Sequence, residues 1–188
     1  MFRRRTNHTL TSIFEPSWEG LKRGEHCLRY ATRQYTARLS DGLAGTDMIK
    51  ACKDTPVAIH GELLYTDFCQ DLGFNRGVWG YWIVDFNEPD CETRWGEFTD
   101  LVCLQILFRL EQKRIAARLE NLRKGDDWQF MCVTTPADID GQYYSTPAEC
   151  FNQGRWGVYG SWNLHDNSCD SQQDGVVQAA ISALTQRA

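Results

Sequence analysis

The sequence lacks the features that mark membrane-spanning and nucleic-acid-binding proteins. Its longest apolar stretch, around residues 101–110, is broken by Gln105 and Arg109, whereas a spanning helix needs about 18 consecutive apolar residues. Positive charge is in deficit: 20 lysines and arginines stand against 25 aspartates and glutamates, and the formal net charge is −5. Because no basic field exists, we expect no nucleic-acid partner, and we expect no transmembrane segment.

Sequence motifs that indicate catalysis or metal binding are also missing. The chain contains no Gly-x-Ser-x-Gly, no P-loop and no Gly-x-Gly-x-x-Gly. It has no Cys-x-x-Cys pair, and its four histidines share no metal-ligand spacing. These absences favour a protein that is not an enzyme, and we expect neither a cofactor nor a bound metal.

Cysteine and tryptophan are what the sequence has in plenty. Eight cysteines and seven tryptophans occur in 188 residues of otherwise ordinary globular composition. An even number of cysteines without metal-ligand spacing indicates disulfide bonds and an oxidising compartment, so we expect an extracellular protein. The basic residues at the start of this sequence are not followed by the apolar core of a signal peptide.

An internal duplication is the strongest signal in the chain. Residues 36–67 align without a gap to residues 116–147, and eleven of these 32 positions are identical. Residues 77–82 then match residues 157–162, and the eight cysteines divide into four per copy. We predict an N-terminal arm, two repeats and a C-terminal helical tail, with the bounds 1–17, 18–94, 95–169 and 170–188.

The spacing within the repeats predicts mainly helical units. The second repeat has four extra residues after Cys103, which is about one helical turn. Leu101, Leu104, Phe108, Ile115 and Leu119 recur at helical intervals. We therefore expect an α+β fold in which two disulfide-stabilised units, each a long helix with a small hairpin, are related by a pseudo-twofold axis. Thr-Pro steps end a second, short helix in each repeat.

The duplication also narrows the disulfide pairing. If each repeat closes its own bonds identically, three schemes remain. Pairing Cys27 with Cys52 is disfavoured, because one extra helical turn would lengthen the corresponding span in the second repeat by about 6 Å. Of the two remaining schemes we favour the one that pairs Cys27–Cys91, Cys52–Cys69, Cys103–Cys169 and Cys132–Cys150.

The second repeat carries a resemblance to a known group. Its runs 114–132, 134–141 and 157–162, with Cys150 and Cys169, resemble uncharacterised small cysteine-rich secreted proteins of mushroom-forming fungi. The first repeat follows the same pattern more loosely. The resemblance implies a secreted fungal protein, and it implies no catalytic residues.

Aromatic residues around the repeated glycines are the candidate ligand site. Strand alternation predicts Trp82 and Trp162 in the core, on the side of the neighbouring valines. The rings on the other side could form a platform on which a sugar stacks, with Gly80 and Gly160 leaving room for it. The alternative is that these rings only fill the core. The candidate ligand-binding residues are Trp79, Tyr81, Trp156 and Tyr159.

We therefore expect a secreted, non-enzymatic, cysteine-rich binding protein whose partner is a polysaccharide or a host surface protein. A first alternative is a small hydrolase that uses the recurring carboxylates of Asp47 and Asp127 or of Asp85 and Asp166, although helix capping and turns also explain these residues. A second is an effector-like protein that acts on a host protein or membrane through an apolar patch on residues 98–122.

Overall fold

The computed structural model describes residues 16–40, 47–73, 75–106 and 109–165, with side chains except those of residues 102–112. It forms two compact units: the described parts of Met1–Gly24 and Gln34–Val84 make unit 1, and those of Glu25–Arg33 and Asp85–Ala188 make unit 2. These units group residues by contact, whereas the sequence repeats group them by similarity, so the repeat bounds stay a prediction. The described chain is mainly antiparallel β-sheet with two short α-helices. The expectation of a mainly helical fold is therefore wrong.

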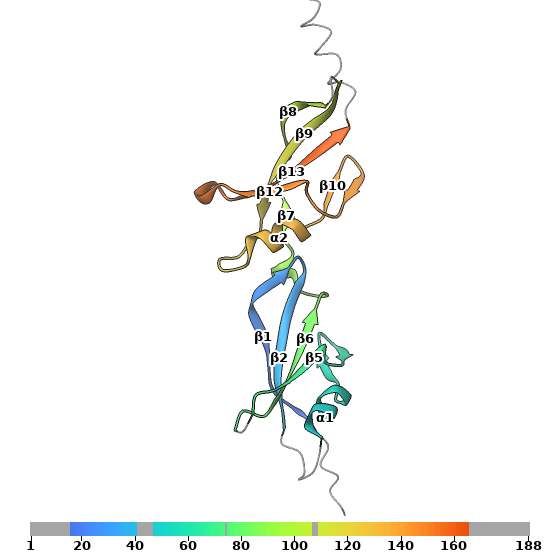
Figure 1. Cartoon of the computed structure of the whole chain (residues 1–188), viewed down its shortest axis with the longest axis vertical. Coiled ribbons are helices and arrows are strands. Elements are labelled where there is room, and N and C mark those ends of the chain that lie inside the picture. The colour runs from blue at the N-terminus through green and yellow to red at the C-terminus, as the bar shows by residue number, and fades with distance from the viewer. Residues whose placement is uncertain (1–15, 41–46, 74, 107–108, 166–188) are drawn as a thin grey trace, which may run out of the picture. The chain divides into compact units, whose positions relative to one another are not determined.

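Unit 1 is built on a four-stranded sheet in the order β1-β2-β6-β5 (Figure 1). Its strands are β1 (Trp18–Arg29), β2 (Thr32–Leu39), β5 (Phe68–Asp71) and β6 (Val78–Val84); the β1–β2 turn, residues Glu25–Arg33, is grouped with unit 2. A small hairpin joins β3 (Val57–Ile59) to β4 (Glu62–Leu64). The helix α1 (Met48–Asp54) packs beside β5 and β6, to which the Cys52–Cys69 disulfide ties it.

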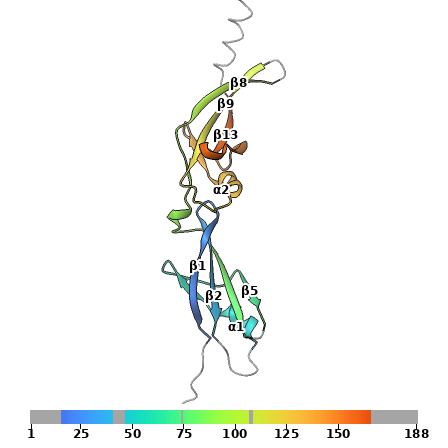
Figure 2. The same ribbon diagram turned by 90° about the vertical axis from the view of Figure 1, so that its left-hand side faces the viewer.

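Unit 2 repeats this plan around a sheet in the order β12-β13-β9-β7, with β8 also paired to β9 (Figure 2). Its strands are β7 (Arg94–Trp95), β8 (Thr99–Ile106), β9 (Arg109–Glu120), β12 (Glu149–Asn152) and β13 (Val158–His165). A small hairpin joins β10 (Ala137–Ile139) to β11 (Gln142–Tyr144). The remaining elements are the helix α2 (Trp128–Thr134) and the short 3-10 turns η1 (Pro89–Cys91) and η2 (Gly154–Trp156).

Equivalent tryptophans anchor the sheet of each unit. Trp18 meets Trp82 edge-on at 4.7 Å between ring centroids, and Trp95 meets Trp162 in the same way at 4.8 Å. The indole N–H of Trp18 donates to the carbonyl of Thr55, and that of Trp95 donates to the carbonyl of Thr135. The sequence duplication is thus matched by a duplicated packing arrangement. The expected core positions of Trp82 and Trp162 are confirmed, since both are almost fully buried.

The segment expected to be a long helix is a pair of strands. In β9 the side chains of Ile115, Ala117 and Leu119 are buried, while those of Arg118 and Glu120 are exposed; the small Ala116, which pairs with both β8 and β13, is buried as well. This alternation has the period of a strand. The four-residue insertion does not distinguish a helix from a strand. An even number of residues keeps each side chain on its face of a strand, and four residues, about one turn, keep each side chain on its face of a helix.

The two short helices are confirmed, and aspartates begin them. The Asp47 carboxylate accepts a hydrogen bond from the backbone N–H of Lys50, and the Asp127 carboxylate accepts from those of Gln129 and Phe130. Each helix ends at the expected threonine, Thr55 or Thr135, before proline. No helix in the described part of the chain is both long enough and apolar enough to cross a lipid bilayer.

Disulfides hold the cores of both units. The structure contains Cys27–Cys91, Cys52–Cys69 and Cys132–Cys150, which are three of the four pairs that the duplication predicts. The fourth pair, Cys103–Cys169, lies outside the described side chains, as do the helical tail 170–188 and all but the last two residues of the arm 1–17. Leu119 packs with Cys27, Cys91 and Cys132 in one buried cluster.

Leu119→Ala should lower the free energy of unfolding by about 2–5 kcal/mol, because it removes a buried aliphatic side chain and leaves a cavity. Glu120→Ala should change it by less than about 1 kcal/mol, since the ion pair of Glu120 with Arg94 lies in solvent. Urea unfolding of both variants measures the difference. Equal, small effects would show that β9 does not face the core as described.

Candidate ligand-binding faces

The outer face of the unit 1 sheet carries a row of rings. Along β6 the burial alternates, so that Val78, Gly80 and Trp82 point inward while Trp79 and Tyr81 point outward. Tyr81 stacks on Phe68 of the neighbouring strand, with centroids 4.3 Å apart and planes 6° from parallel. Phe68 remains 45% exposed. Solvent therefore reaches aromatic surface on this side of the sheet.

Polar contacts fix the orientation of two of these rings. The indole N–H of Trp79 donates to the carbonyl of Arg76 at 2.9 Å. The hydroxyl of Tyr81 donates to the side-chain oxygen of Gln70 at 3.0 Å. Rings held in this way lose little conformational entropy when a flat ligand covers them.

Unit 2 has a smaller outward ring pair. Tyr159 of β13 lies opposite Phe151 of β12, and their rings stack with centroids 5.8 Å apart. Trp156 lies apart from this pair in η2, where it is 61% exposed and the Arg155 guanidinium covers its ring at 4.8 Å. The structure thus places all four predicted residues at least partly in solvent, with Trp79 and Tyr81 neighbours on one face.

The role expected for Gly80 and Gly160 is wrong. A Cβ at Gly80 would lie 2.5 Å from the ring of Trp18, and one at Gly160 would lie 2.6 Å from the ring of Trp95. Both glycines therefore point into the core and make room for a half-buried tryptophan ring. They leave no room on the face where a sugar would stack.

An arginine and a groove accompany the outward ring in each unit. Arg38 and Trp79 line a groove of about 430 Å³ in unit 1. Arg118, which is the cross-strand partner of Tyr159, lines a groove of about 450 Å³ in unit 2 together with Tyr159 and Phe151. Ring and guanidinium are thus neighbours in both units, and such a pair suits a ligand with hydroxyl groups beside a flat apolar surface.

A glycine in each unit lets the backbone lie close to the arginine side chain. Gly77 and Gly157 have φ values of 66° and 101°, which disfavour any other residue. A Cβ at Gly77 would lie 3.1 Å from the Arg38 Nε, and one at Gly157 would lie 2.7 Å from the Arg118 Nε. The strand therefore approaches each guanidinium closely.

Sequence reasoning missed these arginines and glycines as parts of the site. The signal was available, because all four are identities in the duplicated segments. In a segment that is expected to be helical, identical arginines fit a solvated helix face as well as they fit a ligand site.

Two of the four carboxylates proposed for a hydrolase cap helices in the described structure. Asp47 and Asp127 each cap a helix, as described above. Asp85 is exposed, and Asp166 lies outside the described residues.

A separate acidic groove of about 380 Å³ is lined by Asp100, Asp138 and Asp140, and in it Lys113 Nζ lies 2.7 Å from Asp100 Oδ2. Among the described side chains no group of three or more potential ligands has a metal-binding arrangement.

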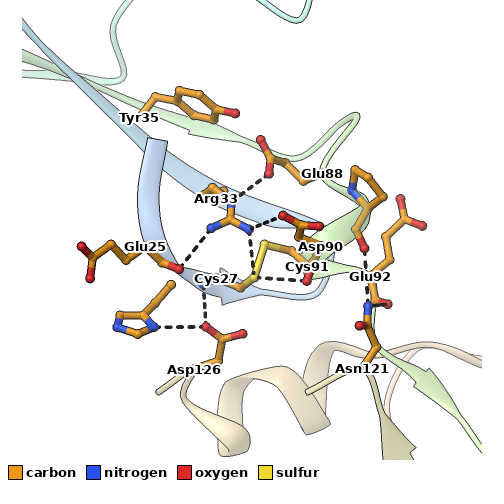
Figure 3. Close-up of polar contacts among 12 residues, drawn as sticks. Glu25, Cys27, Arg33, Tyr35, Glu88, Asp90, Cys91, Glu92, Asn121 and Asp126 are labelled. Atoms are coloured by element: carbon orange, nitrogen blue, oxygen red, sulfur yellow. Dashed lines mark hydrogen bonds and ion pairs between the residues drawn. A yellow bond between two sulfur atoms is a disulfide. The ribbon is translucent and has the colours of Figure 1, made fainter. Parts of the chain in front are cut away.

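A buried ionic cluster surrounds the Cys27–Cys91 disulfide in unit 2 (Figure 3). The Arg33 Nε donates to the Glu88 carboxylate at 2.8 Å, and both side chains are at most 2% exposed. Arg33 also donates to the carbonyl of Glu25 at 3.3 Å and lies 3.9 Å from Asp90. Because it is buried and internally paired, this cluster is not available to a ligand.

Asp126 extends the same network. Its Oδ1 accepts a hydrogen bond from the Cys27 N–H at 3.0 Å and lies 3.4 Å from the His26 Nδ1. Nearby, burial raises the pKa of the Tyr30 hydroxyl above its usual value, with smaller contributions from Glu92 and Tyr143. The tyrosine therefore stays neutral and its hydroxyl keeps its proton at physiological pH.

In comparisons with known proteins, no family model matches the chain, and neither a curated protein nor a solved structure matches it significantly.

Proposed function

We propose that the protein is a secreted, non-enzymatic binding protein whose ligand is a polysaccharide of the cell-wall type. The observation that carries this proposal is the outward row formed by Trp79, Tyr81 and Phe68 beside a groove in unit 1. The disulfides support an extracellular setting, as does the resemblance of the second repeat to secreted fungal proteins.

Stacking on the rings supplies the affinity in this proposal. A sugar ring lying flat on one exposed aromatic gains on the order of 1 kcal/mol, judged from other aromatic contacts. That is about a fivefold gain in affinity, which is too small for tight binding of a single sugar. A polymer that reaches the rings of both units gains further affinity from the high effective concentration of the second site. The protein should therefore prefer long glycans to short ones.

A second candidate is a protein partner, and a specific surface favours it. Phe130 and Val133 lie three residues apart on α2 and are 59% and 43% exposed. The corresponding residues of α1 are Lys50 and Lys53. Exposed apolar residues on only one of two equivalent helices suit a host surface protein as partner.

A pull-down with insoluble chitin, β-glucan and cellulose at pH 7 tests the glycan proposal. We expect the protein to bind at least one of them. The double variant Trp79→Ala/Tyr159→Ala should lower that affinity by more than about tenfold, since it removes one ring from each unit. For a neutral polysaccharide, binding should depend only weakly on salt.

The matched control is Leu63→Ala. This variant removes an apolar side chain that is 71% exposed on the separate β3–β4 hairpin, and it should leave binding unchanged. Failure to bind all three polysaccharides, or full binding by the double variant, would remove the glycan proposal. Binding to cell-surface proteins that Phe130→Lys/Val133→Lys abolishes would favour the second candidate.

A further inference from the structure

The two units differ in charge around the same arginine. In unit 1 the Arg38 Nη1 lies 3.4 Å from the Glu19 carboxylate. Glu19 follows Trp18, and in unit 2 the residue that follows the equivalent Trp95 is Gly96. Its backbone N–H donates to the carbonyl of Arg118, so that position 96 lies beside this arginine. At this position unit 2 therefore lacks the carboxylate that pairs with the arginine in unit 1, and Arg118 forms no ion pair with another described side chain.

A second groove extends this positive charge. It measures about 720 Å³, and Arg118, Arg123 and Lys124 all line it. Within the described part of the chain these three side chains form no ion pair at 4.0 Å or less. Their charges are therefore available to an anionic ligand.

The carboxylates that line the same groove are engaged elsewhere. The Glu120 carboxylate accepts a hydrogen bond from Arg94 Nε at 3.0 Å. The Asp126 side chain is fully buried and is held by Cys27 and His26, as described above. Glu97 does not line this groove; it lines the ring groove, as Glu120 also does, and neither carboxylate forms an ion pair with Arg118 among the described side chains.

Arg118 belongs to both grooves of unit 2. It lines the basic groove with Arg123 and Lys124, and it lines the ring groove with Tyr159 and Phe151. A glycan chain with one sugar on Tyr159 would therefore bring an acidic group of the same or the next sugar within reach of Arg118.

We propose that unit 2 binds an acidic polysaccharide, with sugar rings on Tyr159 and carboxylate or sulfate groups on Arg118, Arg123 and Lys124. This inference rests on the proposed glycan-binding function and assigns a ligand class to one of its two faces. In unit 1 the equivalent arginine is already paired with Glu19, so we assign the preference for acidic groups to unit 2.

Titration calorimetry with polygalacturonate and with its fully methyl-esterified form tests the proposal, because the two polymers share a backbone and differ in charge. We expect the wild-type protein to bind the acidic form at least about tenfold more tightly in about 50 mM salt. The preference should shrink severalfold in about 500 mM salt, because the charges are exposed. Dextran sulfate against dextran forms the sulfate arm, and a preference for the charged polymer in either arm supports the proposal.

Gly96→Glu is the decisive variant, since it gives unit 2 the carboxylate that unit 1 already has. A Cβ at this position would meet the movable Glu120 carboxylate at 3.2 Å, and thermal unfolding checks that the variant folds. Gly96→Glu and Arg118→Ala should each remove most of the preference for the charged polymer. The control Lys53→Ala removes an exposed cation on α1 that lines neither groove of unit 2, and it should leave the preference intact.

The possible failures are distinguishable. Equal binding of the charged and neutral polymers, or an unchanged preference in Arg118→Ala, overturns the acidic ligand while the glycan-binding function stands. If no polysaccharide of either kind binds, both the inference and the proposed function fall.

Discussion

Arg33→Met should lower the free energy of unfolding by about 3–5 kcal/mol, which is among the largest effects expected of a single substitution in this chain. The Glu88 carboxylate is 2% exposed and takes its charge-assisted hydrogen bond from Arg33. Methionine has a similar volume and no charge, so it leaves Glu88 buried without its cation. Urea unfolding, followed by circular dichroism, measures the loss.

The double variant Arg33→Met/Glu88→Leu is the control for this prediction. It removes both buried charges at nearly constant volume, and it should recover most of the stability that Arg33→Met loses. Asp90 lies 3.9 Å from Arg33 but is half exposed, so water solvates it once the guanidinium is gone. An Arg33→Met variant as stable as the wild type would contradict the buried ion pair.

Trp162→Ala should also lower the free energy of unfolding by about 3–5 kcal/mol, because it empties the space of a large core ring. Trp162 is 1% exposed and contacts the rings of Trp95 and Phe98. Tyr159→Ala removes a ring from the opposite face of the same strand and should cost less than about 1.5 kcal/mol.

Measuring both the stability and the polysaccharide binding of each variant distinguishes the core face of β13 from its outer face. We expect Trp162→Ala to shift the urea midpoint strongly, and Tyr159→Ala to shift it little while weakening polysaccharide binding. The same loss of stability from both substitutions would place Tyr159 in the core and withdraw it from the site.

The duplication made part of this fold predictable from the sequence. Aligned aspartates and Thr-Pro steps bound the two short helices, and the repeated cysteines limit the disulfide pairing. The hairpin of β8 and β9 was not predictable from spacing alone, because its four-residue insertion fits either a helix or a strand. The alternating burial of Ile115, Ala117 and Leu119 decides between them.

The site was predictable to a similar extent. Alternation along residues 78–84 separates the outward Trp79 from the buried Trp82 without any structure. The match of Trp18 with Trp95 is visible in the sequence, but nothing there places the following residues, Glu19 and Gly96, beside an arginine. That proximity comes from the structure, in which Glu19 pairs with Arg38 and the Gly96 N–H donates to the Arg118 carbonyl.

The indole N–H signals in a ¹⁵N-labelled sample test the central claim most directly. The chain has seven tryptophans, and Trp→Phe variants assign the signals of Trp79, Trp82 and Trp162. On addition of a soluble oligosaccharide of the polysaccharide that the pull-down identifies, the Trp79 signal should shift with ligand concentration until it saturates. The signals of the buried Trp82 and Trp162 should stay in place. A stationary Trp79 signal at saturating ligand would contradict the account.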